Sequence, residues 1–199
     1  MNFEEFLKSN HKTGKSLLKE MPQYYRGKVS YQKDSKFIPI SMANFKSYEI
    51  LGEDAELVFC VDASHTTGFV FAQDDVKRSP RAGMVPLMRV ALRETPLKGY
   101  KQAYALRIQE RASRKGIATS WYLLYVNRFG GIVSDFEHLE GGKILWKSFL
   151  ETAALRNLKI STYNFDTGEL TPINAANISD EEIWSEDDSK RNLVIVLEK

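Results

Sequence analysis

The chain has 199 residues and a formal net charge of +2, with 43% hydrophobic and 27% charged residues. This balance is typical of a globular protein long enough for one domain with its own core. No apolar run is long enough to span a bilayer, and the first residues are polar and acidic. We therefore expect no membrane association, no secretory signal and a cytoplasmic location. One cysteine and three histidines exclude an internal disulfide and offer no metal-ligand spacing.

The N-terminal part of the chain predicts short pieces of structure without a clear motif. A short amphipathic helix begins near Phe3. Gly14-Lys15-Ser16 ends like a phosphate-binding loop, but Ser9 stands where that motif needs glycine, so the loop is excluded. The aromatic and basic cluster Tyr24–Lys28 is expected to pack against the core edge rather than stack on a base.

Two strands are predicted next, at residues 56–63 and 67–72, joined by a hairpin turn that contains His65. Cys60 lies in the first of these strands, where a buried and inert thiol is expected. Residues 73–83 are polar and charged and predict a surface loop. Residues 84–92 are mostly apolar and predict a strand or a short helix.

The middle of the chain predicts a strand, a basic turn, a helix and a second strand. Apolar and polar residues alternate from Tyr104 to Ile108, and a turn with Gly116 follows. From Ile117 onward the apolar residues fall on helical spacing, until Gly130-Gly131 ends the helix. Ile132-Val133 begins the next strand.

This turn is a candidate anion site. The first N–H groups of a helix have no partner inside the helix, and the helix dipole is positive there. Gly116 allows a phosphate to approach the backbone, and Arg114 and Lys115 add positive charge. A pyrophosphate is the ligand that fits this pattern. An ordinary connection with solvated charges fits it equally well.

The last third of the chain predicts a helix followed by three strands. The helix covers residues 143–155, with Leu145, Phe149 and Ala153 on one buried face. A strand at 157–164, a turn at 166–168 and a returning strand at 169–171 form a hairpin, and residues 193–197 form the last strand.

Charge is unevenly distributed along the chain. Residues 77–115 hold eleven Lys or Arg and only two acidic residues, whereas residues 135–199 hold thirteen Asp or Glu and seven Lys or Arg. The basic segment 77–115 is a possible contact for an anion such as a nucleic acid. Alternatively, the two segments complement each other within the fold.

The turn also resembles a known motif. Arg114-Lys115-Gly116-Ile117-Ala118 is similar to the acyl-CoA loop of the GNAT (Gcn5-related N-acetyltransferase) superfamily, Arg/Gln-x-x-Gly-x-Gly/Ala, although Ser113 departs from its first position. Ser134-Asp135 and the segment 142–149 resemble GNAT-like proteins that phages often encode. The resemblance covers about residues 99–165.

The resemblance implies an α/β (α+β) fold with a mixed central sheet flanked by helices. All 199 residues would form one domain, with 1–55 as an N-terminal elaboration and 100–165 as the acyl-CoA-binding core. The cofactor would be acetyl-CoA or another acyl-CoA. In the superfamily, the strand before the loop splays from the strand after the helix and holds the pantetheine arm. The corresponding residues here are Leu106, Arg107 and Ile108, and those for the pyrophosphate are Arg114, Lys115, Gly116, Ile117, Ala118 and Thr119.

The catalytic residues that the resemblance implies are less regular. Many relatives place a proton-donating tyrosine on the helix after the fifth strand, where this chain has Trp146, so Ser148 or Tyr163 would have to substitute. Asp135 is the candidate base or acceptor-orienting group, and Glu110 is an alternative base. Asp135 could equally cap a turn or helix.

Three functions follow as hypotheses. The first is an N-acyltransferase acting on an amine of a small molecule, protein or nucleic acid. The second is a GNAT-fold enzyme that modifies DNA bases or nucleotides, as some phage relatives do, which would place it in the host cytoplasm. The third is a non-enzymatic binding or inhibitory protein on the same scaffold, which Trp146 favours.

Overall fold

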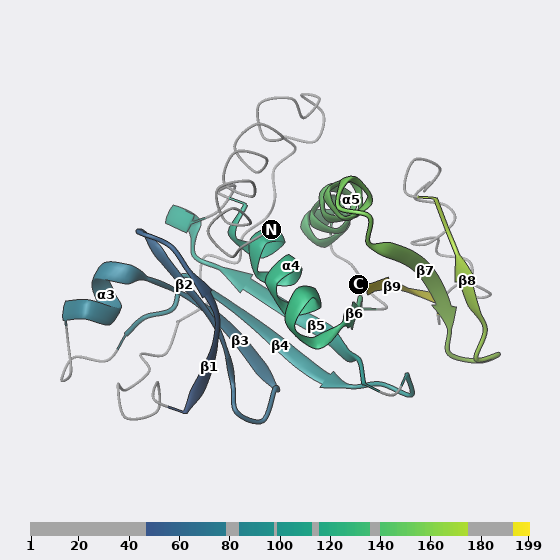
Figure 1. Ribbon diagram of the computed structural model, residues 1–199, viewed down its shortest axis with the longest axis horizontal. Helices are drawn as coiled ribbons and strands as arrows, with labels where there is room; N and C mark the ends of the chain where they lie inside the picture. The colour runs from purple at the N-terminus through teal and green to yellow at the C-terminus, as the bar shows by residue number, and fades with distance from the viewer. Residues whose placement is uncertain (1–46, 79–83, 98, 113–115, 136–139, 175–192) are drawn as a thin grey trace. The chain divides into compact units, whose positions relative to one another are not determined.

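The computed structural model describes residues 47–78, 84–97, 99–112, 116–135, 140–174 and 193–199 (Figure 1). The predictions for the helix near Phe3, for Gly14-Lys15-Ser16 and for the cluster Tyr24–Lys28 lie outside these residues. So do Arg114 and Lys115.

Strands dominate the described part of the chain. The strands are β1 Tyr48–Glu53, β2 Leu57–Asp62, β3 Thr67–Ala72, β4 Met88–Glu94, β5 Lys101–Ile108, β6 Gly131–Val133, β7 Lys159–Asn164, β8 Leu170–Pro172 and β9 Leu193–Glu198. The helices are α3 Gln73–Arg78, α4 Ile117–Phe129 and α5 Glu140–Leu155, with a 3-10 turn η2 at Glu110–Ala112. Within the described residues, no helix has the length and apolar character needed to cross a membrane.

The strands are hydrogen-bonded in the order β1-β2-β3-β4-β5-β6-β9-β7-β8. β5 and β6 pair in parallel, whereas β2 with β3 and β9 with β7 are examples of antiparallel pairs, so the sheet is mixed. The predicted α/β class with a mixed sheet is therefore confirmed. Parallel neighbours need a crossover connection, which here contains α4.

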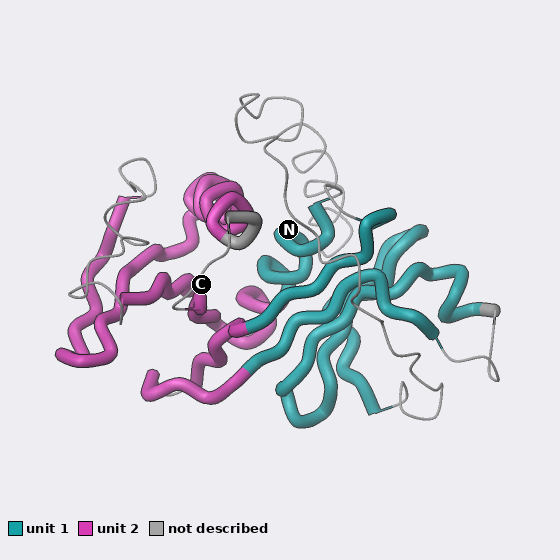
Figure 2. The backbone as a smooth tube through the Cα atoms, turned by 180° about the vertical axis from the view of Figure 1, so that it is seen from behind, with its two compact units in different colours: residues 1–92, 105–124 teal, residues 93–104, 125–199 magenta. Residues whose placement is uncertain are grey.

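The chain divides into two compact units, each of which is discontinuous in sequence (Figure 2). Unit 1 comprises residues 1–92 and 105–124, and unit 2 comprises residues 93–104 and 125–199. The divisions fall inside β4, β5 and α4. The prediction of a single domain over all 199 residues stays a prediction.

The core of unit 1 forms where the first half of α4 packs against the strands. Trp121 is fully buried, and its indole Nε1 donates a hydrogen bond of 3.0 Å to the Cys60 carbonyl oxygen on β2. Gly68 on β3 leaves the space that the indole ring fills. The helical spacing predicted from Ile117 onward is therefore confirmed, with Trp121 and Leu124 buried.

A second cluster in unit 1 surrounds the Cys60 side chain. It contains Phe69, Phe71 and Met84, with Val76 of α3 packed against it. Burial, with a smaller contribution from Asp62, raises the pKa of the Cys60 thiol to about 12, as expected for an inert buried thiol.

The prediction of a surface loop at residues 73–83 is wrong for its first half, where Gln73–Arg78 form α3. Asp74 and Asp75 lie in the first turn and stabilise the helix dipole, and Val76 is partly buried against the Cys60 cluster. Residues 79–83 lie outside the described part.

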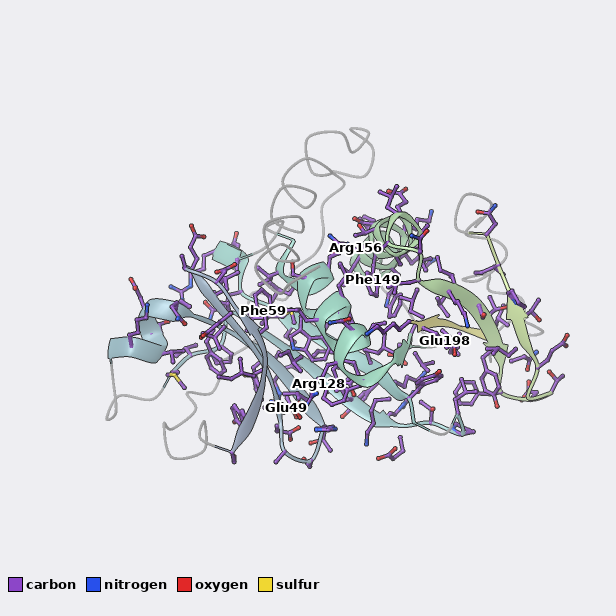
Figure 3. The ribbon with its side chains drawn as sticks, in the orientation of Figure 1. Glu49, Phe59, Arg128, Phe149, Arg156 and Glu198 are labelled. Carbon is purple, nitrogen blue, oxygen red and sulfur yellow. The ribbon has the colours of Figure 1, made fainter. Side chains whose placement is uncertain are left out.

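Unit 2 is built around β9, which lies between β6 and β7. A buried cluster contains Val133, Tyr163, Val194 and Val196. α5 buries Phe149, which Figure 3 labels. The hairpin predicted at 157–171 is confirmed as β7 and β8, joined through Gly168 with a φ of +72°.

Candidate functional site

The predicted anion site lies in unit 1, where the chain leaves β5, passes through η2 and enters α4. Gly116 has a φ of +73°, a left-handed conformation that favours glycine. Its carbonyl oxygen accepts the Ser120 N–H hydrogen bond at 2.9 Å, which makes Gly116 the N-cap residue immediately before α4.

The side chains that follow Gly116 face inward. Ile117 and Ala118 are each 3% exposed, and Thr119 is half-buried. A ligand at this end of α4 would therefore meet the backbone N–H groups of Ile117 and Ala118 and not their side chains. Such groups bind anions because they lack partners inside the helix.

The pairing of β5 with β6 is short and involves only residues of unit 2. The described pairs are Lys101 with Ile132 and Gln102 with Val133, although β5 continues to Ile108. From residue 104 onward the burial of β5 falls: Leu106 and Ile108 are half-buried and the remaining residues are exposed. The predicted strand is confirmed, but its apolar residues are not fully covered.

Gln109 holds the end of β5 in place. Its N–H donates to the Leu87 carbonyl oxygen at 2.8 Å, and its side-chain Nε2 donates to the Pro86 carbonyl oxygen at 2.7 Å. Arg111 Nε donates to Gln109 Oε1 at 2.7 Å. These bonds fix the start of the turn that leads to Gly116. Glu110, the alternative base, is exposed in η2.

A polar cluster, which we call the Arg93 cluster, lies in unit 2 and comprises Arg93, Gln102, Ser134 and Asp135. Arg93 Nε donates to Gln102 Oε1 at 2.7 Å, and Gln102 Nε2 donates to the Ser134 carbonyl oxygen at 2.7 Å. Arg93 Nη2 lies 3.4 Å from Asp135 Oδ1. Asp135, the candidate base, therefore forms an ion pair with an arginine.

The base of this cluster is buried. Gln102 is 2% exposed, and Ser134 is completely buried. Ser134 Oγ accepts a hydrogen bond of 2.9 Å from the Ile195 N–H on β9 and donates one of 3.1 Å to the Asp135 carbonyl oxygen. Asp135 is thus attached to the sheet through its neighbour. A capping role for Asp135 would involve the residues that follow it. Residues 136–139 lie outside the described part of the chain, so the capping role stays a prediction.

Arg93 and Gln102 were not predicted as site residues. Arg93 continues the alternation of β4, in which Met88, Val90 and Leu92 are buried, so it reads as an ordinary solvent-facing position. Gln102 lies at the start of β5 without any motif. A lone Gln in a predicted buried strand is the one signal available, because buried amides need hydrogen-bond partners.

The other candidate catalytic residues of unit 2 occupy different elements. Tyr163 on β7 is 7% exposed and packs edge-on against Phe165, with ring centroids 5.0 Å apart. Ser148 is half-buried on α5, and its carbonyl oxygen accepts the Thr152 hydroxyl hydrogen bond. Trp146 is 3% exposed and packs against Phe149, so it belongs to the core.

Among the described residues, no group of three His, Cys, Asp or Glu side chains is placed to hold a metal ion. Comparison of the chain with protein-family models, curated proteins and solved structures gave no match.

Proposed function

We propose that the protein is an acyl-CoA-dependent N-acyltransferase of the GNAT type. The observation that carries this proposal is the two-residue parallel pairing of β5 with β6, followed by η2, Gly116 and α4. In the superfamily that the Gly116 turn resembles, the strand before the loop splays from the strand after the helix. The acyl-CoA would lie along β5 and reach the start of α4.

The chemistry of the donor fits the end of β5 and the Gly116 turn, which both lie in unit 1. An extended pantetheine arm carries amides that can hydrogen-bond to an unpaired strand edge, in the manner of an added strand. Leu106 to Ile108, which lie beyond the two described pairs of β5 with β6, would provide that edge. The pyrophosphate would bind at Gly116 to Thr119, where backbone N–H groups and the helix dipole favour an anion. Arg114 and Lys115 would add charge.

The reaction itself needs few groups. The nitrogen of a neutral amine attacks the thioester carbonyl carbon, the C–S bond breaks, and the CoA thiolate leaves while the nitrogen loses a proton to a base or water. Because Asp135 lies beside Arg93, we assign Asp135 the role of orienting the acceptor amine. Of the two proposed proton donors, Ser148 is the more accessible, whereas Tyr163 is buried in an apolar cluster.

Modification of DNA bases or nucleotides remains the second candidate, because Arg89, Arg107 and Arg111 of the basic segment are all exposed. Binding to DNA that weakens steeply with salt would favour it. A non-enzymatic scaffold is the third candidate, and the core position of Trp146 in place of a tyrosine supports it.

The decisive experiment is calorimetric titration of acetyl-CoA into wild type and two matched variants, Gly116→Trp and Gly130→Trp. Both glycines have positive φ, +73° and +90°, and they lie at opposite ends of α4. Both substitutions therefore strain the backbone alike, by about 1–2 kcal/mol. Only the first would obstruct the phosphates.

We expect Gly116→Trp to lose CoA affinity by about tenfold or more, the equivalent of one lost charged hydrogen bond. Gly130→Trp should bind like wild type, because a Cβ at that position meets nothing within 4 Å. Circular dichroism of both variants checks the fold. Unchanged affinity in a folded Gly116→Trp would reject the phosphate site, and a wild type that binds no CoA would reject the proposed function.

A further inference from the structure

The Arg93 cluster presents opposite charges side by side, with Arg93 on β4 and Asp135 two residues after the end of β6. The Arg93 side chain is 45% exposed and that of Asp135 is 22% exposed, so both reach the surface of unit 2. We propose that Arg93 and Asp135 form a recognition site for the carboxylate and ammonium groups of a free α-amino acid. This amino acid would be the acceptor in the proposed acyl transfer, and that role rests on the proposed function, although binding itself needs no acyl donor.

The orientation of the guanidinium group is set by a buried amide. Gln102 Oε1 accepts from Arg93 Nε while Gln102 Nε2 donates to the Ser134 carbonyl oxygen. The carbonyl partner can only accept and the guanidinium can only donate, so the amide has one satisfactory orientation. Hydrogen bonds of this kind are strong in a buried environment. Gln102 is therefore a positioning residue for Arg93.

Tyr104 supports the guanidinium from one face. Its ring centroid lies 5.2 Å from Arg93 Cζ, and the ring is 43% exposed. A guanidinium that stacks on a ring uses its face for that contact and keeps its edges for hydrogen bonds. A carboxylate fits such an edge, because the planar fork of arginine matches its two oxygens.

Asp135 provides the complementary charge. Its backbone is tied to β9 through Ser134, which fixes the point from which the side chain extends. The separation of 3.4 Å between Arg93 Nη2 and Asp135 Oδ1 is long for a charged hydrogen bond, which indicates a weak direct contact. A ligand that brings one carboxylate and one ammonium group would add a charged contact to each residue.

The arrangement restricts the class of amine. In a free α-amino acid both charged groups are bonded to the same carbon, so they are close enough to meet two adjacent side chains. The N-terminus of a peptide, a lysine side chain or a polyamine carries the ammonium group without a neighbouring carboxylate. Those amines would leave Arg93 without its ligand contact. Binding holds the ammonium group beside Asp135, and the group becomes a nucleophile once a base or water has taken its proton.

The test is calorimetric titration of the full chain, without CoA, with the standard L-amino acids one at a time. For the amino acid that binds tightest, the C-terminal amide and the N-acetyl form are titrated as well. We expect each of these analogues to bind about 10- to 100-fold more weakly, because each lacks one charged contact.

The variants Arg93→Gln and Asp135→Asn should weaken binding by a similar factor. Arg93→Lys serves as a second variant with conserved charge, and it should also weaken binding because lysine lacks the fork and the Nε donor. The matched control is Arg128→Gln, which changes an exposed arginine of α4 in the same unit but outside the Arg93 cluster and should leave affinity unchanged.

The inference is overturned if no amino acid binds to wild type, if the amide or the N-acetyl form binds equally well, or if Arg128→Gln weakens binding as much as Arg93→Gln. These results are separable from failure of the proposed function. Amino-acid binding without CoA binding would retain the site and reject the acyltransferase. CoA binding without amino-acid binding would reject the amino-acid site and leave the acyltransferase proposal standing.

Discussion

Gly68 determines how closely α4 approaches the sheet of unit 1. A Cβ at this position would lie 2.0 Å from Trp121 Cζ2, 2.5 Å from Trp121 Cε2 and 2.6 Å from Val90 Cγ1. Trp121 cannot easily move away, because it is fully buried and its indole N–H is bonded to the Cys60 carbonyl oxygen. We therefore expect Gly68→Ala to destabilise the protein strongly.

The magnitude follows from two contributions. Overpacking of a filled core costs about 1–3 kcal/mol. Displacement of the indole would leave a buried donor and acceptor unpaired, which costs about another 1–3 kcal/mol. The sum, about 2–6 kcal/mol, is a large part of the 5–15 kcal/mol that is typical of a folded domain. Urea denaturation followed by circular dichroism measures the change as a lower midpoint at constant slope.

A double-mutant cycle with Trp121→Phe tests the stated cause. The smaller ring of phenylalanine does not reach the position of Cζ2, so the added methyl group meets less resistance. The cost of Gly68→Ala should then fall by about 1 kcal/mol or more in the Trp121→Phe background, while the close approach to Val90 remains. An equal cost in both backgrounds would refute the reasoning, because the penalty would not come from the indole.

Two further predictions concern ionisable groups. Tyr100 donates a hydrogen bond to Glu198, which Figure 3 labels, and this bond together with burial raises the pKa of Tyr100 from 10.0 to about 12. The bond should therefore stabilise the fold fully below pH 10 and lose its effect as the pH rises toward 12. In a spectroscopic titration of tyrosinate, Glu198→Gln should lower the pKa of Tyr100, and Tyr100→Phe identifies which part of the signal belongs to Tyr100. Burial alone would raise the pKa of Asp62, but hydrogen bonds from Thr67, Thr66 and Ser64 outweigh it and lower the pKa below 3.8. The Asp62 carboxylate should thus stabilise the fold fully above pH 3.8, and this stabilisation should be lost as the pH falls further. The urea midpoint should therefore fall less for Asp62→Asn than for wild type when the pH is lowered through this range. An equal fall in both proteins would contradict the prediction.

Local features of the sequence predicted several elements correctly. The helix α4 is flanked by Gly116 and Gly130, which both adopt positive φ, and apolar residues recur at helical spacing between them. The turn between β7 and β8 is equally local: Asn164 Oδ1 accepts from the N–H groups of Asp166 and Thr167, and Gly168 provides the left-handed residue. The residues that define such a helix or turn lie close together in the chain, so these elements can be predicted from one sequence.

The helix α3 could not be predicted from local composition. Gln73–Arg78 is polar and has little apolar periodicity, which favoured a loop. What holds it as a helix includes the contact of Val76 with the Cys60 cluster, whose members come from β2, β3 and the segment before β4. Local composition does not contain that contact.

The candidate sites divide in the same way. The Gly116 turn before α4 could be predicted from the sequence, because a turn glycine and the first residues of a helix are neighbours in the chain. Asp135 was also predicted as a site residue. That Arg93 and Gln102 join Asp135 follows from strand pairing, since β4 and β5 are hydrogen-bonded neighbours and β5 pairs in parallel with β6, the strand after α4. Pairing between strands is set by which buried faces fit together over the whole sheet, and no window of neighbouring residues records it.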